Sequence, residues 1–152
     1  MFLECLKLGI PIRGILHDFS KFRPSEFFPY AKHFYGEKGN IKKGRDKTGC
    51  YKPYDTGDFA FDYAWFLHQK RNSHHWQWWV MPLDSDGTVS QVVKLVPMKD
   101  KVVLEMVADW RGAGRAQGTP DVKAWYEKNK NKLVISCDTR LKVEKLLYGD
   151  SA

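Results

Sequence analysis

Apolar residues recur at helical spacing over much of the chain. In residues 2–18 they lie three and four positions apart, and the pattern breaks near Gly9 and Pro11. Residues at this spacing share one face of an α-helix, whereas glycine and proline interrupt one. The segment therefore predicts two short helices or one kinked helix.

Two longer helices are predicted next. Residues 23–36 open with a capping signal, Ser25 followed by Glu26, and stop at Gly36. Residues 56–76 have enough apolar positions at helical spacing for one long helix. We expect its apolar stripe to consist of Phe59, Tyr63, Trp65 and Leu67.

Residues 79–98 change to the pattern of a hairpin. β-Branched runs lie on either side of DSDG at residues 84–87, which is a turn signal. Helical spacing then returns in residues 99–116, which are expected to form a helix that ends at a glycine pair. The apolar positions of that helix are Val102, Val103, Met106 and Val107.

Two further helices are predicted towards the C-terminus. One has Thr119 as its cap and Pro120 at its first position, where the missing N–H of proline is harmless. The other is expected to be capped by Asp138 or Thr139. Together these patterns predict a mostly α protein with one small β-hairpin insertion.

Length and composition indicate a single domain that is rich in aromatic residues. The 152 residues are enough for one domain with a sizeable core, expected to span residues 1–152. Six Trp, seven Tyr and nine Phe are many for such a length, and they either fill a helical core or line a pocket in which planar ligands stack.

The net charge of +7 favours phosphate-bearing partners. Much of it lies in a predicted basic loop at about residues 36–56, which equally suits a solvated loop that only aids solubility. No stretch is apolar for long enough to span a membrane. The cysteines are odd in number and scattered, which argues against disulfides and thiolate metal sites and favours a cytoplasmic protein.

Three short stretches carry most of the histidines and several acids. The first is the doublet His17-Asp18, which directly follows Ile15 and Leu16 at the expected rim of the core. A carboxylate or imidazole removed from water must be hydrogen-bonded, paired or metal-bound. The doublet therefore predicts a partner for both side chains.

The second stretch contains His68, Asn72, His74 and His75. If it is one helix, His68 and His75 lie on one face, two turns apart, with Asn72 between them. We expect this face to point into the core and to bury the histidines.

The third stretch contains Asp109, which shares an apolar helix face with Val102 and Met106. An inward carboxylate needs a positive partner. Imidazole and carboxylate groups suit Mn, Fe, Co, Ni, Zn or Mg, so we predict one or two divalent ions. The predicted metal ligands are His17, Asp18, His68, His74, His75 and Asp109.

This set resembles the HD-domain superfamily of metal-dependent phosphohydrolases, which are all-helical. Their signature is a His, a later His-Asp doublet and a distant Asp, and the last two match His17-Asp18 and Asp109. In their cyclic-dinucleotide phosphodiesterases the doublet continues as His-Asp-x-x-Lys, which Lys21 reproduces. The resemblance implies a single HD-like helical domain and a phosphohydrolase activity.

One further feature fits this resemblance and one departs from it. Members with two metals carry an adjacent histidine pair, which His74-His75 resembles. The HD pattern also expects a histidine before the doublet, and residues 1–16 contain none. Either the chain begins downstream of it, or another group such as His33 or His68 fills the position. His33 otherwise suits a structural role between aromatic residues.

The chain is also similar, over nearly its full length, to a small uncharacterised family of phages and bacteria. That family carries the same HDxSKF…EF.PYA, H…N.HHW and ADW.GAG blocks. The resemblance names no substrate, and it implies the host cytoplasm if a phage encodes the protein.

The predicted function is hydrolysis of a nucleotide or another phosphate ester by a metal-activated water. Catalytic roles are expected for Asp18, Lys21 and Asp109. Cationic side chains would neutralise the phosphate, and a tryptophan after the histidine pair would stack on a base. The predicted substrate-binding residues are Lys21, Lys70, Arg71, Asn72, Trp76, Arg111 and Arg115.

Each residue also has an ordinary explanation. A histidine such as His17 can cap a helix C-terminus, and Asp109 can pair with Arg111 or Arg115. The later histidines can be core residues bonded to backbone carbonyls, and Trp76 can pack in the core. Two other functions therefore stay open: a non-enzymatic nucleic-acid- or nucleotide-binding protein that uses its basic loop and aromatics, and a structural protein with an inward hydrogen-bonded network.

Overall fold

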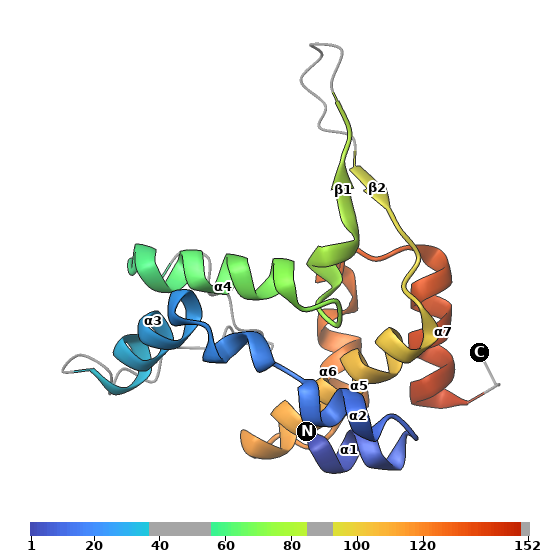
Figure 1. Ribbon diagram of the computed structural model, residues 1–152. Helices are drawn as coiled ribbons and strands as arrows, with labels where there is room; N and C mark the ends of the chain where they lie inside the picture. The colour runs from blue at the N-terminus through green and yellow to red at the C-terminus, as the bar shows by residue number, and fades with distance from the viewer. Residues whose placement is uncertain (37–55, 85–92, 150–152) are drawn as a thin grey trace. The chain divides into compact units, whose positions relative to one another are not determined.

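The computed structural model describes residues 1–36, 56–84 and 93–149, which group into two compact units (Figure 1). The first unit consists of Met1–His17 and Ser73–Ala152, and the second unit of Asp18–Asn72. The expectation of a single domain stays a prediction. The predicted basic loop lies almost entirely outside the described residues.

Helices dominate the first unit, and a two-stranded sheet projects from it (Figure 1). Helices α1 and α2 pack on each other, α1 packs on α5, and both α6 and α7 pack on α5. This mostly α architecture with a small hairpin confirms the predicted fold class. The elements are α1 (Phe2–Lys7), α2 (Pro11–Leu16), η2 (Trp76–Trp79), β1 (Val80–Pro82), β2 (Val93–Leu95), α5 (Asp100–Ala116), α6 (Val122–Asn129), η3 (Lys130–Lys132) and α7 (Cys137–Tyr148).

Helix α5 supplies more core residues to the first unit than any other of its described elements does. Its apolar face meets Tyr126 of α6 and two residues of α7, Val143 and Leu147. The predicted face of Val102, Val103, Met106 and Val107 is buried in this core, as expected from its helical spacing.

The predicted break between the first two helices is confirmed, since α1 ends at Lys7 and α2 begins at Pro11. Gly9 lies in the connection with φ of +72°, which favours glycine. Gly14 lets the two helices approach closely, because an added Cβ would lie 2.7 Å from Cβ of Cys5. The break is therefore a tight helix pair and not a kink.

The predicted end of α5 at its glycine pair is wrong. Helix α5 continues through Gly112 and Gly114 and ends at Ala116, and Gly118 then adopts φ of +73°. An added Cβ on Gly114 would lie 2.6 Å from the Thr119 carbonyl oxygen. The glycines therefore allow the chain to pass close to the helix and do not stop it.

Two predicted caps are also wrong by a few positions. Asp121 caps α6 by accepting a hydrogen bond from the Ala124 N–H, and Ser136 caps α7 by accepting one from the Thr139 N–H. The expected cap residue Thr139 instead lies inside α7, where its hydroxyl accepts a bond from the Met98 N–H. A nearby residue with an equally suitable side chain made each true cap hard to identify.

The predicted hairpin is confirmed as an antiparallel pair in which Val80 lies opposite Leu95 and Pro82 opposite Val93. The DSDG turn lies outside the described residues, apart from Asp84. None of the described helices combines the length and the apolar character needed to cross a membrane.

The second unit contains η1 (Phe19–Phe22), α3 (Pro24–Tyr35) and α4 (Phe59–Arg71), and α3 packs along α4 (Figure 1). The end of α3 at Gly36 is confirmed, but its N-cap is Arg23 and not Ser25, and Arg23 makes no capping bond with its side chain. Proline at the first position of α3 starts the helix instead.

The predicted stripe of α4 is wrong, because its buried residues are Phe61, Ala64 and His68. Phe59 and Tyr63 are exposed. Aromatic residues of α4 lie on both its buried face and its exposed face, so the spacing of apolar residues did not distinguish the two faces. The helix also ends at Arg71, and the histidine pair therefore lies beyond it.

Candidate metal-binding site

His17 of the first unit lies between two carboxylates of α5. It occupies the C-cap position of α2, and its side chain is only 7% exposed. Nδ1 lies 3.5 Å from Glu105 Oε1, and Nε2 lies 3.2 Å from Asp109 Oδ1. The expectation that Ile15 and Leu16 enter the core here is wrong, since both are exposed. Helix α5 buries the imidazole instead.

His74 joins the same cluster. It is buried, its Nδ1 lies 3.5 Å from Glu105 Oε1, and its ring centroid lies 4.2 Å from that of His17. His17, His74 and Asp109 can each offer a ligand atom such that all these atoms lie within 4.8 Å of one another. Three of the predicted ligands therefore meet within the first unit.

Glu105 holds this cluster together. It accepts hydrogen bonds from His17, His74 and the Arg13 guanidinium. Burial opposes ionisation of its carboxyl group, but these bonds outweigh burial and hold the pKa of Glu105 well below its ordinary value. Glu105 is therefore an anion at neutral pH.

The two carboxylate contacts of His17 leave a place for a cation. If Nδ1–H donates to Glu105, Nε2 carries the lone pair and faces Asp109 Oδ1 at 3.2 Å. Two lone pairs at that separation repel each other unless a proton or a metal ion lies near both. A carboxylate behind the imidazole and a second carboxylate in front of it is a common arrangement of histidine metal ligands.

The second unit repeats this arrangement around His68. Nδ1 of His68 lies 2.9 Å from Glu26 Oε2, and Nε2 lies 3.2 Å from Asp18 Oδ1. His68 and Glu26 are both almost completely buried. Asp18 and His68, two of the predicted metal ligands, therefore lie side by side in this unit.

Polar neighbours stabilise the Glu26 anion. The Arg71 guanidinium and the Ser20 hydroxyl donate hydrogen bonds to it, and together with His68 they lower its pKa in spite of burial. Asn72 Nδ2 lies 2.7 Å from Ser20 Oγ and 2.8 Å from the His68 carbonyl oxygen. Ser20 and Glu26 both contact the same nitrogen of His68, so this is not the geometry of a serine nucleophile.

The backbone of Asp18 is unusual. Its φ of +58° makes it the one non-glycine residue with positive φ in residues 1–36, 56–84 and 93–149. Aspartate tolerates this left-handed conformation better than most residues, yet strained backbone is characteristic of functional sites. Lys21, predicted to be catalytic, forms a salt bridge with the Asp18 carboxylate.

The predicted helical face shared by His68 and His75 is wrong, because α4 ends four residues before His75. Asn72 is the C-cap residue of α4, and its side chain does contact His68 by donating a hydrogen bond to the His68 carbonyl oxygen. His75 lies in the first unit, where its ring centroid is 4.3 Å from that of His74.

The other predicted substrate-binding residues are dispersed among different partners. Arg115 pairs with the buried Glu4, Arg71 binds Ser25 and Glu26, and Trp76 packs against the core of the first unit. Lys70 is exposed and Arg111 is half-buried. A role in substrate binding stays a prediction for all of these residues.

His33 has the structural environment that its aromatic neighbours predicted. Its ring stacks on Phe61 with centroids 3.7 Å apart, and its Nδ1 lies 3.1 Å from Asp58 Oδ2. It therefore does not belong to either histidine–carboxylate cluster.

Sequence reasoning did not identify Glu105, Glu26, Ser20 and Arg13 as site residues. Glu105 had a usable signal, because it lies four positions before Asp109 and thus on the same helix face. Glu26 had none, because its contact with His68 joins residues 42 positions apart.

Comparison with known proteins places this chain in a family. No curated protein and no solved structure matches it. The model of a family of unknown function (DUF5662) matches residues 1–148. The chain therefore belongs to the DUF5662 family.

Proposed function

We propose that this protein is a metal-dependent phosphohydrolase that binds a divalent ion through His17, His74 and Asp109. The convergence of these three side chains, with their ligand atoms within 4.8 Å of one another, is the observation that carries the proposal. Two imidazoles and one carboxylate leave coordination positions for water and substrate, which is typical of catalytic sites.

The donor set favours certain ions. Imidazole nitrogen suits Zn, Fe, Co and Ni, and carboxylate oxygen suits Mn and Mg. The cysteines among the described residues are not in the cluster, since Cys5 packs beside α5 in the core and Cys137 is exposed. Mn²⁺, which suits the carboxylate, and Co²⁺, which suits the imidazoles, are therefore the first ions to test.

Asp18 and His68 supply a second imidazole–carboxylate pair within the second unit. We propose that this pair also binds a divalent ion, which accounts for the prediction of one or two ions. Lys21 would change from pairing with Asp18 to contacting the substrate phosphate, since an ammonium group binds both kinds of oxygen.

A divalent ion held by His17, His74 and Asp109 would lower the pKa of a coordinated water towards neutrality, so that hydroxide would be available to attack phosphorus. The residues of the chain have separate tasks in this proposal. Asp109 and the imidazoles hold the ion, Glu105 orients the imidazoles, and nearby cationic side chains offset the charge of the phosphate. The membership of the HD superfamily is proposed on the His17-Asp18, Lys21 and Asp109 pattern.

Metal analysis of protein purified without chelator tests the binding step. We expect the wild type to retain one or two divalent ions, and His17→Ala and Asp109→Asn each to retain one fewer than the wild type. His33→Ala and Asp100→Asn are matched controls. They make the same substitutions at positions outside the cluster, so these variants should retain the metal. Full retention in His17→Ala and Asp109→Asn would end the proposal.

A hydrolysis screen then tests the reaction. Nucleoside mono- and triphosphates, cyclic nucleotides and a simple phosphate ester would be offered with Mn²⁺ or Co²⁺. We expect turnover by the wild type, at least about 100-fold less by Asp109→Asn, and full turnover by Asp100→Asn. Metal binding without turnover of any of these substrates would contradict the hydrolase proposal while leaving the metal site in place.

A further inference from the structure

The outward face of α4 carries a row of aromatic side chains. Phe59, Tyr63 and Phe66 are 83%, 53% and 49% exposed. They follow one another at intervals of four and three residues, so they share one face of the helix. The opposite face, with Phe61 and His68, is the one that is buried.

These rings are arranged as a stack. Neighbouring centroids lie 6.2 Å apart along the row, and the planes of Phe59 and Tyr63 differ by 6° and those of Tyr63 and Phe66 by 19°. Seven residues of helix extend about 10 Å, which corresponds to roughly three stacked nucleotides. The three rings therefore form an exposed series of nearly parallel aromatic side chains, and aromatic side chains in series stack successive bases in proteins that bind single strands.

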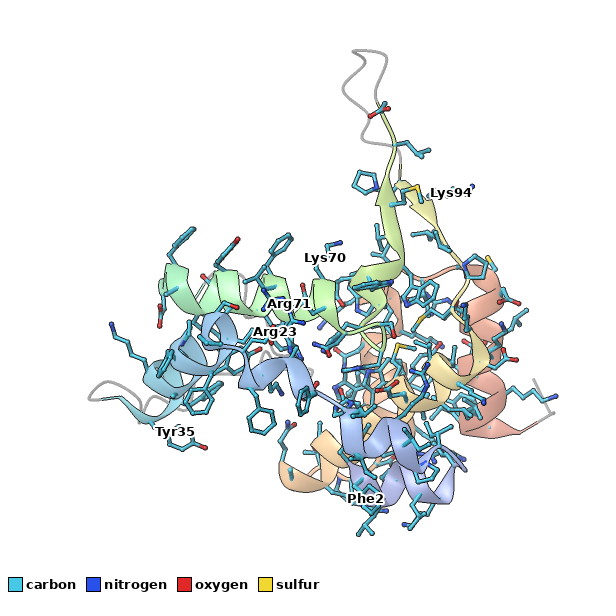
Figure 2. All side chains as sticks on the ribbon, in the orientation of Figure 1. Phe2, Arg23, Tyr35, Lys70, Arg71 and Lys94 are labelled. Atoms are coloured by element: carbon cyan, nitrogen blue, oxygen red, sulfur yellow. The ribbon has the colours of Figure 1, made fainter. Side chains whose placement is uncertain are left out.

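One exposed cation continues this row. Lys70 follows Phe66 by four residues and is exposed on the same face, and Figure 2 shows it on the side of α4 away from α3. Asp58 and Asp62 flank the row. The Asp58 carboxylate accepts a hydrogen bond from the Phe61 N–H, and the Asp62 carboxylate accepts hydrogen bonds from the Thr56 N–H and hydroxyl. The chain as a whole carries +7.

We propose that this aromatic row, Phe59, Tyr63 and Phe66 together with Lys70, binds single-stranded nucleic acid. The rings stack on successive bases and the ammonium group contacts the phosphate backbone. Stacking of this kind tolerates any sequence, because each base has a flat face. The row belongs to the second unit alone and uses none of the residues proposed to bind metal in the first unit.

Fluorescence anisotropy with labelled single strands tests this proposal. The probes are oligonucleotides of about 12 nucleotides, one of dT and one of rU, with a duplex of the same length for comparison. Chelator is present throughout, so the result does not depend on metal binding or on hydrolysis. We expect both single strands to bind, and the duplex to bind more weakly because its bases are already stacked.

Substitution by leucine separates stacking from simple apolar contact. Tyr63→Leu and Phe66→Leu keep an apolar helix-forming side chain but lose the flat ring, and each should weaken single-strand binding about tenfold or more. Tyr35→Leu is the matched control. Tyr35 is 88% exposed at the C-terminal end of α3 (Figure 2), and its loss should leave affinity unchanged. All three positions are exposed, so the variants should fold, which circular dichroism checks.

Lys70→Ala tests the phosphate contact. It should reduce the slope of log affinity against log salt by about 0.7, because one fewer counterion is released from a single strand. Lys94→Ala, at an exposed position on β2, should leave the slope unchanged (Figure 2).

Three results would overturn the proposal. One is a wild type that does not bind single strands at low salt. Another is a Tyr63→Leu or Phe66→Leu variant that binds as tightly as the wild type. The third is that the wild type forms a concentration-dependent dimer, and that the Tyr63→Leu and Phe66→Leu variants lose this dimer but still bind single strands as the wild type does. That result would assign the row to contact with a second copy of the chain.

Discussion

At the scale of single residues, the main feature is a histidine held between a glutamate and an aspartate. In the first unit the order is Glu105, His17, Asp109, and in the second unit Glu26, His68, Asp18. In each case the glutamate contacts Nδ1 and the aspartate contacts Nε2. The glutamates are buried and ionised, so each fixes one ring nitrogen as a donor and turns the other toward the aspartate.

Replacement of Glu105 by glutamine should weaken metal binding without removing a ligand. The amide keeps the shape of the side chain, but it no longer fixes the donor role of Nδ1 in His17 and His74. We expect a loss of metal affinity of about 10- to 100-fold, measured by isothermal titration. Glu127→Gln, at an exposed position, is the control and should bind as the wild type does.

The same substitution should alter the pH dependence of stability. The pKa of Glu105 is lower in the folded protein than its ordinary value of 4.5. Its charge therefore stabilises the folded protein at pH values above 4.5, and this stabilisation is lost progressively as the pH falls below 4.5. Without metal, Glu105→Gln should reduce the free energy of unfolding by about 2 kcal/mol at about pH 7. Urea denaturation should show this difference shrinking as pH falls from about 5 to about 3. A difference that is constant over this range would contradict the assignment.

At the scale of elements, the sequence predicted the helices better than their faces or their ends. The break in the N-terminal helical segment, the buried valine face of α5 and the hairpin were all predicted correctly. In α4 the aromatic residues Phe59, Phe61, Tyr63 and Phe66 lie on opposite faces, so its buried side depends on contacts with α3 that no local pattern encodes. The end of α4 at Arg71 likewise removed the expected helical relation between His68 and His75.

Gly14 should be essential to the packing of α1 against α2. Alanine normally stabilises a helix relative to glycine by about 0.5–1 kcal/mol, but a Cβ here would lie 2.7 Å from Cβ of Cys5. We therefore expect Gly14→Ala to destabilise the protein by about 1–3 kcal/mol in chemical denaturation, which is opposite in sign to the helix propensity.

A double-mutant cycle identifies the cause of that loss. Cys5→Gly removes the atom that the new methyl group would meet, so Cys5→Gly with Gly14→Ala should be less unstable than the sum of the two single variants. Simple additivity would show that Cys5 and Gly14 do not constrain each other, and the close approach of α1 and α2 would then be wrong.

At the scale of the whole molecule, the sequence indicated the candidate ligands but not their grouping. The chain passes from the first unit to the second between His17 and Asp18, and returns between Asn72 and Ser73. Both transitions fall inside the stretches that carry the histidines. The doublet His17-Asp18 therefore contributes one residue to each unit, which its adjacency in sequence did not reveal. Glu105 and Glu26, which contact Nδ1 of His17 and His68, lie in α5 and α3, and only folding brings these helices close to the histidines.

The stability of the molecule should distinguish a metal site from a structural polar network. When the ring of His17 is neutral and Nδ1–H donates to Glu105, its Nε2 and Asp109 Oδ1 face each other with lone pairs. Without metal, Asp109→Asn should then leave the melting temperature unchanged or raise it, because an amide can donate to Nε2. With Mn²⁺ or Co²⁺ at about 100 times its dissociation constant, the wild type should gain about 2.7 kcal/mol more than Asp109→Asn does. A structural network requires the opposite result, in which Asp109→Asn melts at a lower temperature in chelator and metal stabilises neither protein.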